Sequence, residues 1–413
     1  MTEPYAPPSR HAPPPGTAKA PPHAGLSARL RRRPVTIRFD RREAHLATGV
    51  YVAVSLVGFA VLLVLAHRLG HPPESVLRRW DSGNYLGIAE HGYPSEIRYL
   101  PDGTPRWSRL AFFPLLPALV RATHLFTGLA FPWAGVVVVW VCGALAAAGI
   151  HTLVRSLAGR AVGFACVALW TCSPYAFALW VPYSEAVFSA ALFWCLVALV
   201  ARRWVTAGVL CMVAGLVRPT TMVLVGVIAF AALRALWERR ASWAPDALRP
   251  LAALALAPVG LCVSWLYIGS RVGRVDGWFE AERAWGQSFD FGAGKLVFLE
   301  QVARFHEFDI RQAVVLAVIL LTAVALTALV LDRSVPWPLV LAAAGVYVLM
   351  LGTPGSPYSS PRFILPVLPL LLIPVARGVA PAQPLVRWSL YGCGAVFSGW
   401  YAVGLLLVFR KSP

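Results

Sequence analysis

The chain has 413 residues, of which 58% are hydrophobic and only 14% are charged, compared with roughly 25% charged residues in an ordinary soluble domain. This composition, with a mean hydropathy of +0.64, excludes a soluble enzyme, a coiled coil and a disordered regulator. The formal net charge is +18, but the basic residues lie between apolar runs, so we interpret the charge as a marker of membrane topology and anionic lipid rather than of nucleic acid.

Residues 1–45 form a segment rich in Pro and Ala that contains arginine clusters at 31–33 and 41–42. A segment of this composition cannot bury a core, so we expect a disordered tail. The first apolar run, residues 46–66, is too long for the apolar part of a cleaved signal peptide, and we expect an uncleaved anchor. The arginines before it predict that the tail is cytoplasmic.

A polar stretch at about residues 67–110 follows the first run. Ten further apolar runs lie at about 134–154, 161–180, 183–201, 204–217, 219–236, 250–269, 312–331, 337–352, 363–376 and 388–409. Together with the first run they predict an all-α polytopic membrane protein with about eleven transmembrane helices, formed by residues 46–413.

Residues 111–129 are apolar as well, but they contain Pro114, Pro117, Arg121 and His124. If this segment does not span the membrane, the short cytoplasmic loops carry eleven arginines and the short outer turns carry only Arg218 and Arg362. If it does span, the bias reverses. The positive-inside rule therefore favours a non-spanning segment packed against the outer face.

This topology places two larger segments, residues 67–133 and 270–311, on the extracytoplasmic side. The turns near Tyr183, Arg218 and Arg362 face the same side. The polar chemistry thus gathers on one face, which predicts an active site open to the extracytoplasmic space of a multi-pass cell-membrane protein.

Asp81 follows Trp80 at the start of a short helix-like stretch in the first outer segment. A carboxylate at a membrane surface can act as a general base if apolar neighbours raise its pKa toward the working pH. Asp is also a favoured helix N-cap. The sequence leaves both interpretations open.

Three further charged residues lie next to apolar runs. An ionisable residue at membrane depth, such as Glu185, is by default a functional candidate, although a carboxylate in a surface turn can also reach water. Arg218 and Arg362 are each the single basic residue of an outer turn beside a proline. Their guanidinium groups can bind a phosphate in a bidentate manner or extend toward lipid headgroups.

The second outer segment interleaves aromatic side chains with carboxylates and amides. Such a mixture stacks on sugar rings or forms an aromatic belt at the membrane interface, and the belt is the first interpretation here. The residues are Trp278, Phe279, Glu280, Glu282, Trp285, Gln287 and Phe289.

At these residues the chain resembles the PIG-V family, the GPI mannosyltransferase 2 type of the GT-C superfamily of polytopic membrane glycosyltransferases. The resemblance spans about residues 78–376 and rests on an ordered set of short motifs. They are Trp80-Asp81, Ile88-Ala89, Gly92-Tyr93, Phe112-Phe113-Pro114-Leu115 with Pro117, Ser173-Pro174, Tyr183-Ser184-Glu185, Gly215-Leu216 with Arg218, Pro361-Arg362-Phe363 and Leu365-Pro366.

The resemblance implies a GT-C-like fold with a functional first extracytoplasmic loop. It also implies transfer of mannose from a polyprenyl-phosphate-mannose lipid to an acceptor hydroxyl, with Asp81 as the catalytic carboxylate. The residues expected to bind substrate are Trp80, Tyr85, Tyr183, Glu185, Arg218 and Arg362. The acceptor is left open as a glycan, a lipid or a protein.

We expect no cofactor and no metal, because arginines can stabilise a monophosphate leaving group without a divalent cation. Attack from the face opposite the phosphate would invert the anomeric configuration. An alternative hypothesis is a transporter or flippase of a lipid-linked sugar or cell-wall precursor, which predicts two related halves with broken helices. We find no such internal repeat. A third hypothesis is a non-catalytic subunit of another glycosyltransferase.

Overall fold

The computed structural model describes residues 35–238, 248–286, 288–305 and 309–409, so most of the expected tail, residues 1–34, lies outside the described residues. The described part of the chain is helical and contains no strand beyond an isolated antiparallel bridge between Tyr99 and Pro105. The first helix begins at Arg41, five residues before the expected start of the apolar run. It begins there because the Asp40 side chain caps it, accepting a hydrogen bond from the Glu43 N–H.

Within the described ranges, six helical segments are long and apolar enough to cross a membrane, which makes the chain a multi-pass membrane protein. They are α2 (Arg41–Arg68), α6 (Phe131–Ala158), α10 (Thr221–Glu238), α11 with α12 (Leu248–Leu256 and Val259–Val272), α15 (Ile310–Leu331), and α20 with the π-helix η5 (Pro384–Val403 and Gly404–Val408). Four shorter apolar helices are α7 (Arg160–Thr171), α8 (Glu185–Val200), α9 (Trp204–Gly215) and α16 (Trp337–Gly352). The count of eleven spans stays a prediction.

The expected run at residues 363–376 is not one helix. It is divided among α17 (Ser360–Ile364), α18 (Leu368–Leu371) and α19 (Ile373–Val379). Pro369 and Pro374 lie in the first turns of α18 and α19, and proline cannot continue a helix because it lacks the N–H donor and clashes with the preceding turn.

The two long helices α2 and α6 are antiparallel neighbours. The Thr48 hydroxyl near the start of α2 donates to the Ala144 carbonyl, and Glu43 pairs with His151 and Arg155 in the last turns of α6. The chain between Arg68 and Phe131 therefore leaves and returns at the same end of the bundle. The amphipathic helix α5 (Leu115–Thr127) in this connection adds no crossing, as the distribution of arginines predicted.

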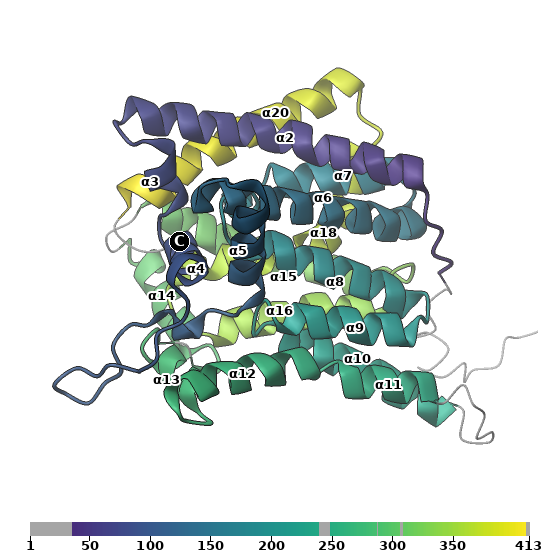
Figure 1. The fold of residues 1–413 in the computed structure, drawn as a ribbon. Helices are drawn as coiled ribbons and strands as arrows, with labels where there is room; N and C mark the ends of the chain where they lie inside the picture. Colours follow the sequence, from purple (N-terminus) through teal and green to yellow (C-terminus); the bar gives the residue numbers. More distant parts are fainter. Residues whose placement is uncertain (1–34, 239–247, 287, 306–308, 410–413) are drawn as a thin grey trace, which may run out of the picture.

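Helix α8 forms the centre of the bundle. Every one of its residues except Trp194 and Val200 is buried, as expected for a helix that is apolar all round. Figure 1 shows α6 and α9 on either side of it, α2 and α20 along one edge of the bundle, and α11 and α12 along the opposite edge.

The short elements that shape the site gather at the end of the bundle where α2 ends and α6 begins, at the left in Figure 1. They are α3 (Pro73–Leu77), α4 (Asp81–His91), η1 (Arg109–Ala111), α5, α13 (Gly277–Arg283), α14 (Ala293–Ala303) and η4 (Pro357–Ser359). A further 3-10 turn, η2 (Ala176–Leu179), precedes α8.

Candidate functional site

Helix α4 begins at Asp81, and the N-cap position is occupied by Trp80. Trp80 has φ +53° and ψ −128° and provides no side-chain cap. The interpretation of Asp81 as an N-cap is therefore wrong. A positive φ is costly for a bulky residue and persists only where the surroundings impose it. Here the Trp80 indole donates a hydrogen bond to the Leu405 carbonyl at 3.2 Å, which anchors the start of α4 to the last helix.

The start of α4 is also packed closely against the chain that precedes it. The Ser82 hydroxyl donates to the Leu77 carbonyl. A Cβ atom on Gly83 would lie 2.4 Å from the Arg78 carbonyl oxygen, so only glycine fits at this position. These contacts fix the first turn of α4 and thereby the position of the Asp81 carboxylate.

The four charged residues singled out in the sequence form one continuous chain of ion pairs. Arg362 Nη1 lies 2.5 Å from Asp81 Oδ2, and Arg362 Nε lies 3.3 Å from Glu185 Oε1. Arg218 pairs with the same Glu185 oxygen from the other side. The Arg362 guanidinium also lies 5.0 Å from the centre of the Tyr183 ring.

This cluster alternates in sign and carries no net charge, which is why it can be buried. Glu185, Arg218 and Arg362 are each less than a tenth exposed. Removal of one partner from such a cluster leaves an uncompensated buried charge, which typically costs about 3–5 kcal/mol. The cluster joins the first turns of α4 and α8 to the α9–α10 turn and α17. It therefore fixes the relative positions of four separate parts of the chain.

A cavity of about 610 Å³ opens beside the cluster. Asp81, Tyr85, Arg218 and Arg362 line it. The catalytic role of Asp81 and the substrate-binding roles of the other three residues stay predictions. Tyr183 and Glu185 are buried and do not line the cavity. Both residues contact Arg362 instead.

Trp80 does not line the cavity either. Its side chain packs against the hydrophobic core and bonds to Leu405. Trp80 therefore belongs to the backbone turn before Asp81 and not to the surface of the cavity, in contrast to the predicted substrate-binding role.

Charged, polar and apolar side chains line the cavity together. Ser184 and Thr220 are among the polar residues, and α10 and α16 contribute apolar side chains that include Met222, Val346, Leu349 and Met350. Such a site can hold a ligand with a charged head and a hydrocarbon tail.

Residues 278–289 contribute more to the cavity than the sequence suggested. Trp278 is buried, its indole donates to the Ala111 carbonyl at 3.2 Å, and Trp285 packs edge-to-face on Phe112. Both tryptophans line the cavity. Trp278 and Trp285 therefore lie around the candidate site, which favours the sugar-stacking interpretation of these two residues over the aromatic belt.

Glu282, the carboxylate between these tryptophans, also lines the cavity. Its removal from water and the nearby charge of Asp81 raise the pKa of Glu282 to about 8. The sequence placed Glu282 in an outer segment but gave no sign that α13 folds over Asp81.

A metal site is not evident in the described ranges, where no group of three or more His, Cys, Asp or Glu side chains is arranged to hold an ion. That the chemistry is metal-independent stays a prediction.

No protein-family profile matches this chain, and no curated protein matches its sequence. Its structure is similar to that of ArnT from Cupriavidus metallidurans bound to undecaprenyl phosphate, with a TM-score of 0.51 and 16% identity over 83% of this chain and 61% of ArnT. The apo state of ArnT gives a TM-score of 0.50, with 17% identity over 83% of this chain and 60% of ArnT.

The similarity to ArnT shows a GT-C-like fold. The predicted fold class is thereby confirmed, whereas the similarity does not show the PIG-V subfamily. The archaeal oligosaccharyltransferase AglB from Archaeoglobus fulgidus, in complex with an inhibitory peptide and a dolichol-phosphate, has a TM-score of 0.46 and 11% identity over 91% of this chain and 57% of AglB. This chain spans about three fifths of the length of these proteins.

Proposed function

We propose that this protein is an inverting membrane glycosyltransferase that moves mannose from polyprenyl-phosphate-mannose to an acceptor hydroxyl on the extracytoplasmic side. The proposal rests on the placement of the Asp81 carboxylate, paired with Arg362, in a cavity that is lined by both charged and apolar side chains. The GT-C fold supports the class of reaction.

The cavity matches the chemistry of a lipid-phosphate sugar donor. A guanidinium has five N–H donors, and the ion pairs occupy one nitrogen of Arg218 and two of Arg362. The remaining donors are available to a phosphate in the cavity, and the apolar side chains that α10 and α16 contribute to the lining fit an isoprenoid chain. The complex of ArnT with undecaprenyl phosphate supports a carrier of this type.

The reaction follows from this arrangement. The acceptor oxygen attacks the anomeric carbon from the face opposite the phosphate and forms the new glycosidic bond. The bond between the anomeric carbon and the phosphate oxygen breaks, and its electron pair goes to the lipid phosphate, whose charge Arg218 and Arg362 stabilise. Asp81 takes the proton of the acceptor hydroxyl.

Glu185 and Tyr183 position the arginines in this scheme. Glu185 contacts both guanidinium groups and is itself almost completely buried. It therefore fixes the distance between the two groups that would hold the phosphate, while the Tyr183 ring supports Arg362 from one side.

The proposal is tested with the purified chain in proteoliposomes that contain polyprenyl-phosphate sugars with labelled mannose, glucose or arabinose, together with membrane extract as acceptor. We expect a labelled glycosidic product from the mannose donor only. Equal product from another sugar would overturn the mannose assignment while retaining the reaction class. Movement of the labelled lipid across the bilayer without product would favour a flippase.

A further inference from the structure

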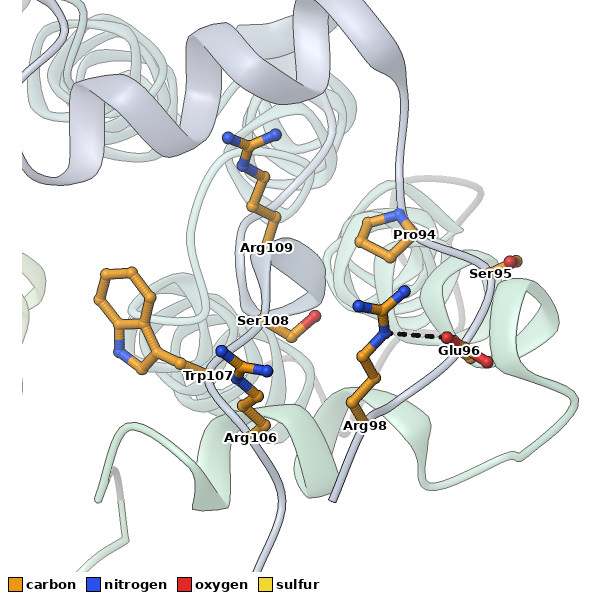
Figure 2. A pocket seen from close by; sticks show the side chains of 8 residues that line it. All are labelled: Pro94, Ser95, Glu96, Arg98, Arg106, Trp107, Ser108 and Arg109. Atoms are coloured by element: carbon orange, nitrogen blue, oxygen red, sulfur yellow. Dashed lines mark hydrogen bonds and ion pairs between the residues drawn. The ribbon is translucent and has the colours of Figure 1, made fainter. Parts of the chain in front are cut away.

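A second cavity, of about 490 Å³, lies in the outer segment between Pro94 and Arg109 (Figure 2). Arg98 and Arg106 are exposed there, and Figure 2 shows the Arg109 guanidinium apart from both of theirs. These cations therefore do not converge on one ligand. A cation that is buried, and that the proposed reaction does not use, lies instead in α14 at Lys295.

Lys295 lies on the buried face of α14. Three side chains of this helix, Lys295, Phe298 and Val302, are at most 5% exposed, and their spacing places them on one side of the helix. Phe298 packs edge-to-face on Tyr358 of η4, with ring centres 6.2 Å apart. Apolar residues usually occupy such a face, and a lysine is rarely found there.

The Lys295 ammonium bonds to a neutral hydroxyl and not to a carboxylate. Lys295 Nζ donates to Ser360 Oγ at 2.7 Å, and it forms no ion pair with a carboxylate of the described residues. The nearby carboxylate of Asp290 accepts the N–H groups of Gly292 and Gly294 instead. Burial lowers the pKa of Lys295 to about 8. Because an uncompensated buried charge destabilises a fold, stability does not explain this lysine.

The Ser360 hydroxyl connects Lys295 to the candidate site. Ser360 is fully buried and is the first residue of α17, a helix of five residues that has no side-chain cap. Arg362 lies two residues further on, and both Arg362 and Ser359 line the cavity that contains Asp81. The contact with Lys295 thus holds the turn from which Arg362 extends.

The chain that leads into α14 is fixed as well. The Asp290 N–H donates to the Gly352 carbonyl at 2.8 Å, and a Cβ atom on Gly352 would lie 2.2 Å from Phe289 Cε2. This chain is therefore packed tightly against the end of α16, so the position of Lys295 relative to the cavity is defined.

We propose that Lys295 is a positioning residue for the lipid phosphate. Through Ser360 Oγ it fixes the first turn of α17, so that Arg362 contacts both carboxylates of the ion-pair cluster and directs its remaining N–H donors at the phosphate. This inference rests on the proposed function. The role does not depend on the charge of Lys295, because a neutral amine keeps N–H groups that donate to Ser360.

The test is equilibrium binding of farnesyl phosphate and of farnesol to the purified full chain in detergent, since the two probes share a chain and differ in the phosphate. The variants are Lys295→Met, which removes the amine at similar volume, Ser360→Ala, and the double variant. Arg304→Gln removes an exposed arginine that follows α14 and pairs with Glu300, and it is the matched control for loss of a positive charge.

We expect Lys295→Met to weaken the binding of farnesyl phosphate on the order of tenfold and to leave farnesol binding unchanged. Ser360→Ala should have the same effect, and the double variant should bind no more weakly than either single variant, because the two side chains act through one contact. The thermal midpoint of Lys295→Met should equal or exceed that of the wild type, since methionine is better suited to a buried site than an unpaired ammonium. Arg304→Gln should bind both probes like the wild type.

Several results would overturn the inference. Wild-type affinity for farnesyl phosphate in Lys295→Met and in Ser360→Ala, or the same loss in Arg304→Gln, would remove the positioning role. Additive losses in the double variant would show that Lys295 does not act through Ser360. An equal loss of farnesol binding, or a lowered thermal midpoint in Lys295→Met, would show that the lysine only supports the fold.

A transfer assay with the same variants separates this inference from the proposed function. If the wild type transfers mannose and Lys295→Met raises the KM for the donor with the acceptor KM unchanged, both stand. If the wild type transfers mannose and Lys295→Met has the wild-type donor KM, the positioning role is wrong and the proposed function stands. If the wild type prefers farnesyl phosphate to farnesol, loses this preference in Lys295→Met and transfers no sugar, the proposed function fails and the positioning role stands.

Discussion

The carboxyl of Glu282 provides a pH-dependent test of the site. It lines the same cavity as Asp81, and burial together with the Asp81 charge raises the pKa of Glu282 to about 8. With that pKa, about nine tenths of the Glu282 groups are protonated at pH 7 and about nine tenths are ionised at pH 9. Ionisation adds a second negative charge beside Asp81, in the space that a lipid phosphate has to occupy.

We therefore expect transfer by the wild type to decline above pH 8. If the ionised form excludes the donor, kcat/KM for the donor falls by about tenfold for each pH unit above the pKa. The substitution Glu282→Gln mimics the protonated group and should keep kcat/KM near its pH 7 value above pH 8, where the wild-type value declines. Glu280→Gln is the control, because Glu280 lies on the same helix, pairs with Arg283 and does not line the cavity.

The assay is the initial rate of transfer from labelled polyprenyl-phosphate-mannose between pH 6 and pH 10, at subsaturating donor. The thermal midpoint is measured at each pH to separate loss of activity from unfolding. Because folding raises this pKa from 4.5 to about 8, the unfolded state ionises first, so Glu282 lowers the unfolding free energy as the pH rises through this range and causes no further loss above it. The same alkaline decline in the wild type and in Glu282→Gln would refute the role given to Glu282.

Three further predictions concern the ion pairs, the metal and the helix packing. In Arg362→Lys the side chain cannot contact Asp81 and Glu185 together, so kcat/KM should fall about 10- to 100-fold while the protein stays folded. Arg362→Met leaves both carboxylates without this partner and should lower the unfolding free energy by about 3–5 kcal/mol. Full activity in Arg362→Lys would contradict the positioning role of Arg362. Transfer should be unchanged after dialysis against EDTA, and restoration of lost activity by a divalent cation would show that metal-independence is wrong. Gly143→Ala should lower the free energy of unfolding by about 1–3 kcal/mol, because the added Cβ would lie 2.0 Å from Tyr51 Oη. Gly49→Ala is the control, since no atom lies within 4 Å of its Cβ, and it should be neutral or stabilising. Thermal unfolding measures both effects.

The sequence singled out the members of the charged cluster because charges are rare in this chain. Asp81, Glu185, Arg218 and Arg362 each adjoin apolar runs, and the predicted topology placed them on one face. Their pairing with one another was not predicted, although buried charges require partners. The uneven distribution of arginine among the loops also predicted that residues 111–129 do not span the membrane, and α5 adds no membrane crossing between α2 and α6.

Other features could not be read from the pattern. The positive φ of Trp80 depends on its contact with Leu405, more than 300 residues away in the chain. The placement of Glu282 in the same cavity as Asp81 depends on the tertiary packing of α13, which the local sequence pattern does not indicate. Residues 363–376 contain prolines that interrupt the helix, but the run is apolar throughout and was therefore predicted as a single helix.

The proposed role of Asp81 as the base of a glycosyl transfer is tested by comparing kcat and donor affinity in the wild type and Asp81→Asn. Glu74→Gln, an exposed carboxylate of α3 outside both cavities, is the matched control. Loss of a general base typically lowers the rate about 10²- to 10⁴-fold. We expect that loss in kcat for Asp81→Asn, with donor still bound and the protein folded, and normal rates for Glu74→Gln. A wild-type kcat in Asp81→Asn would contradict the assignment.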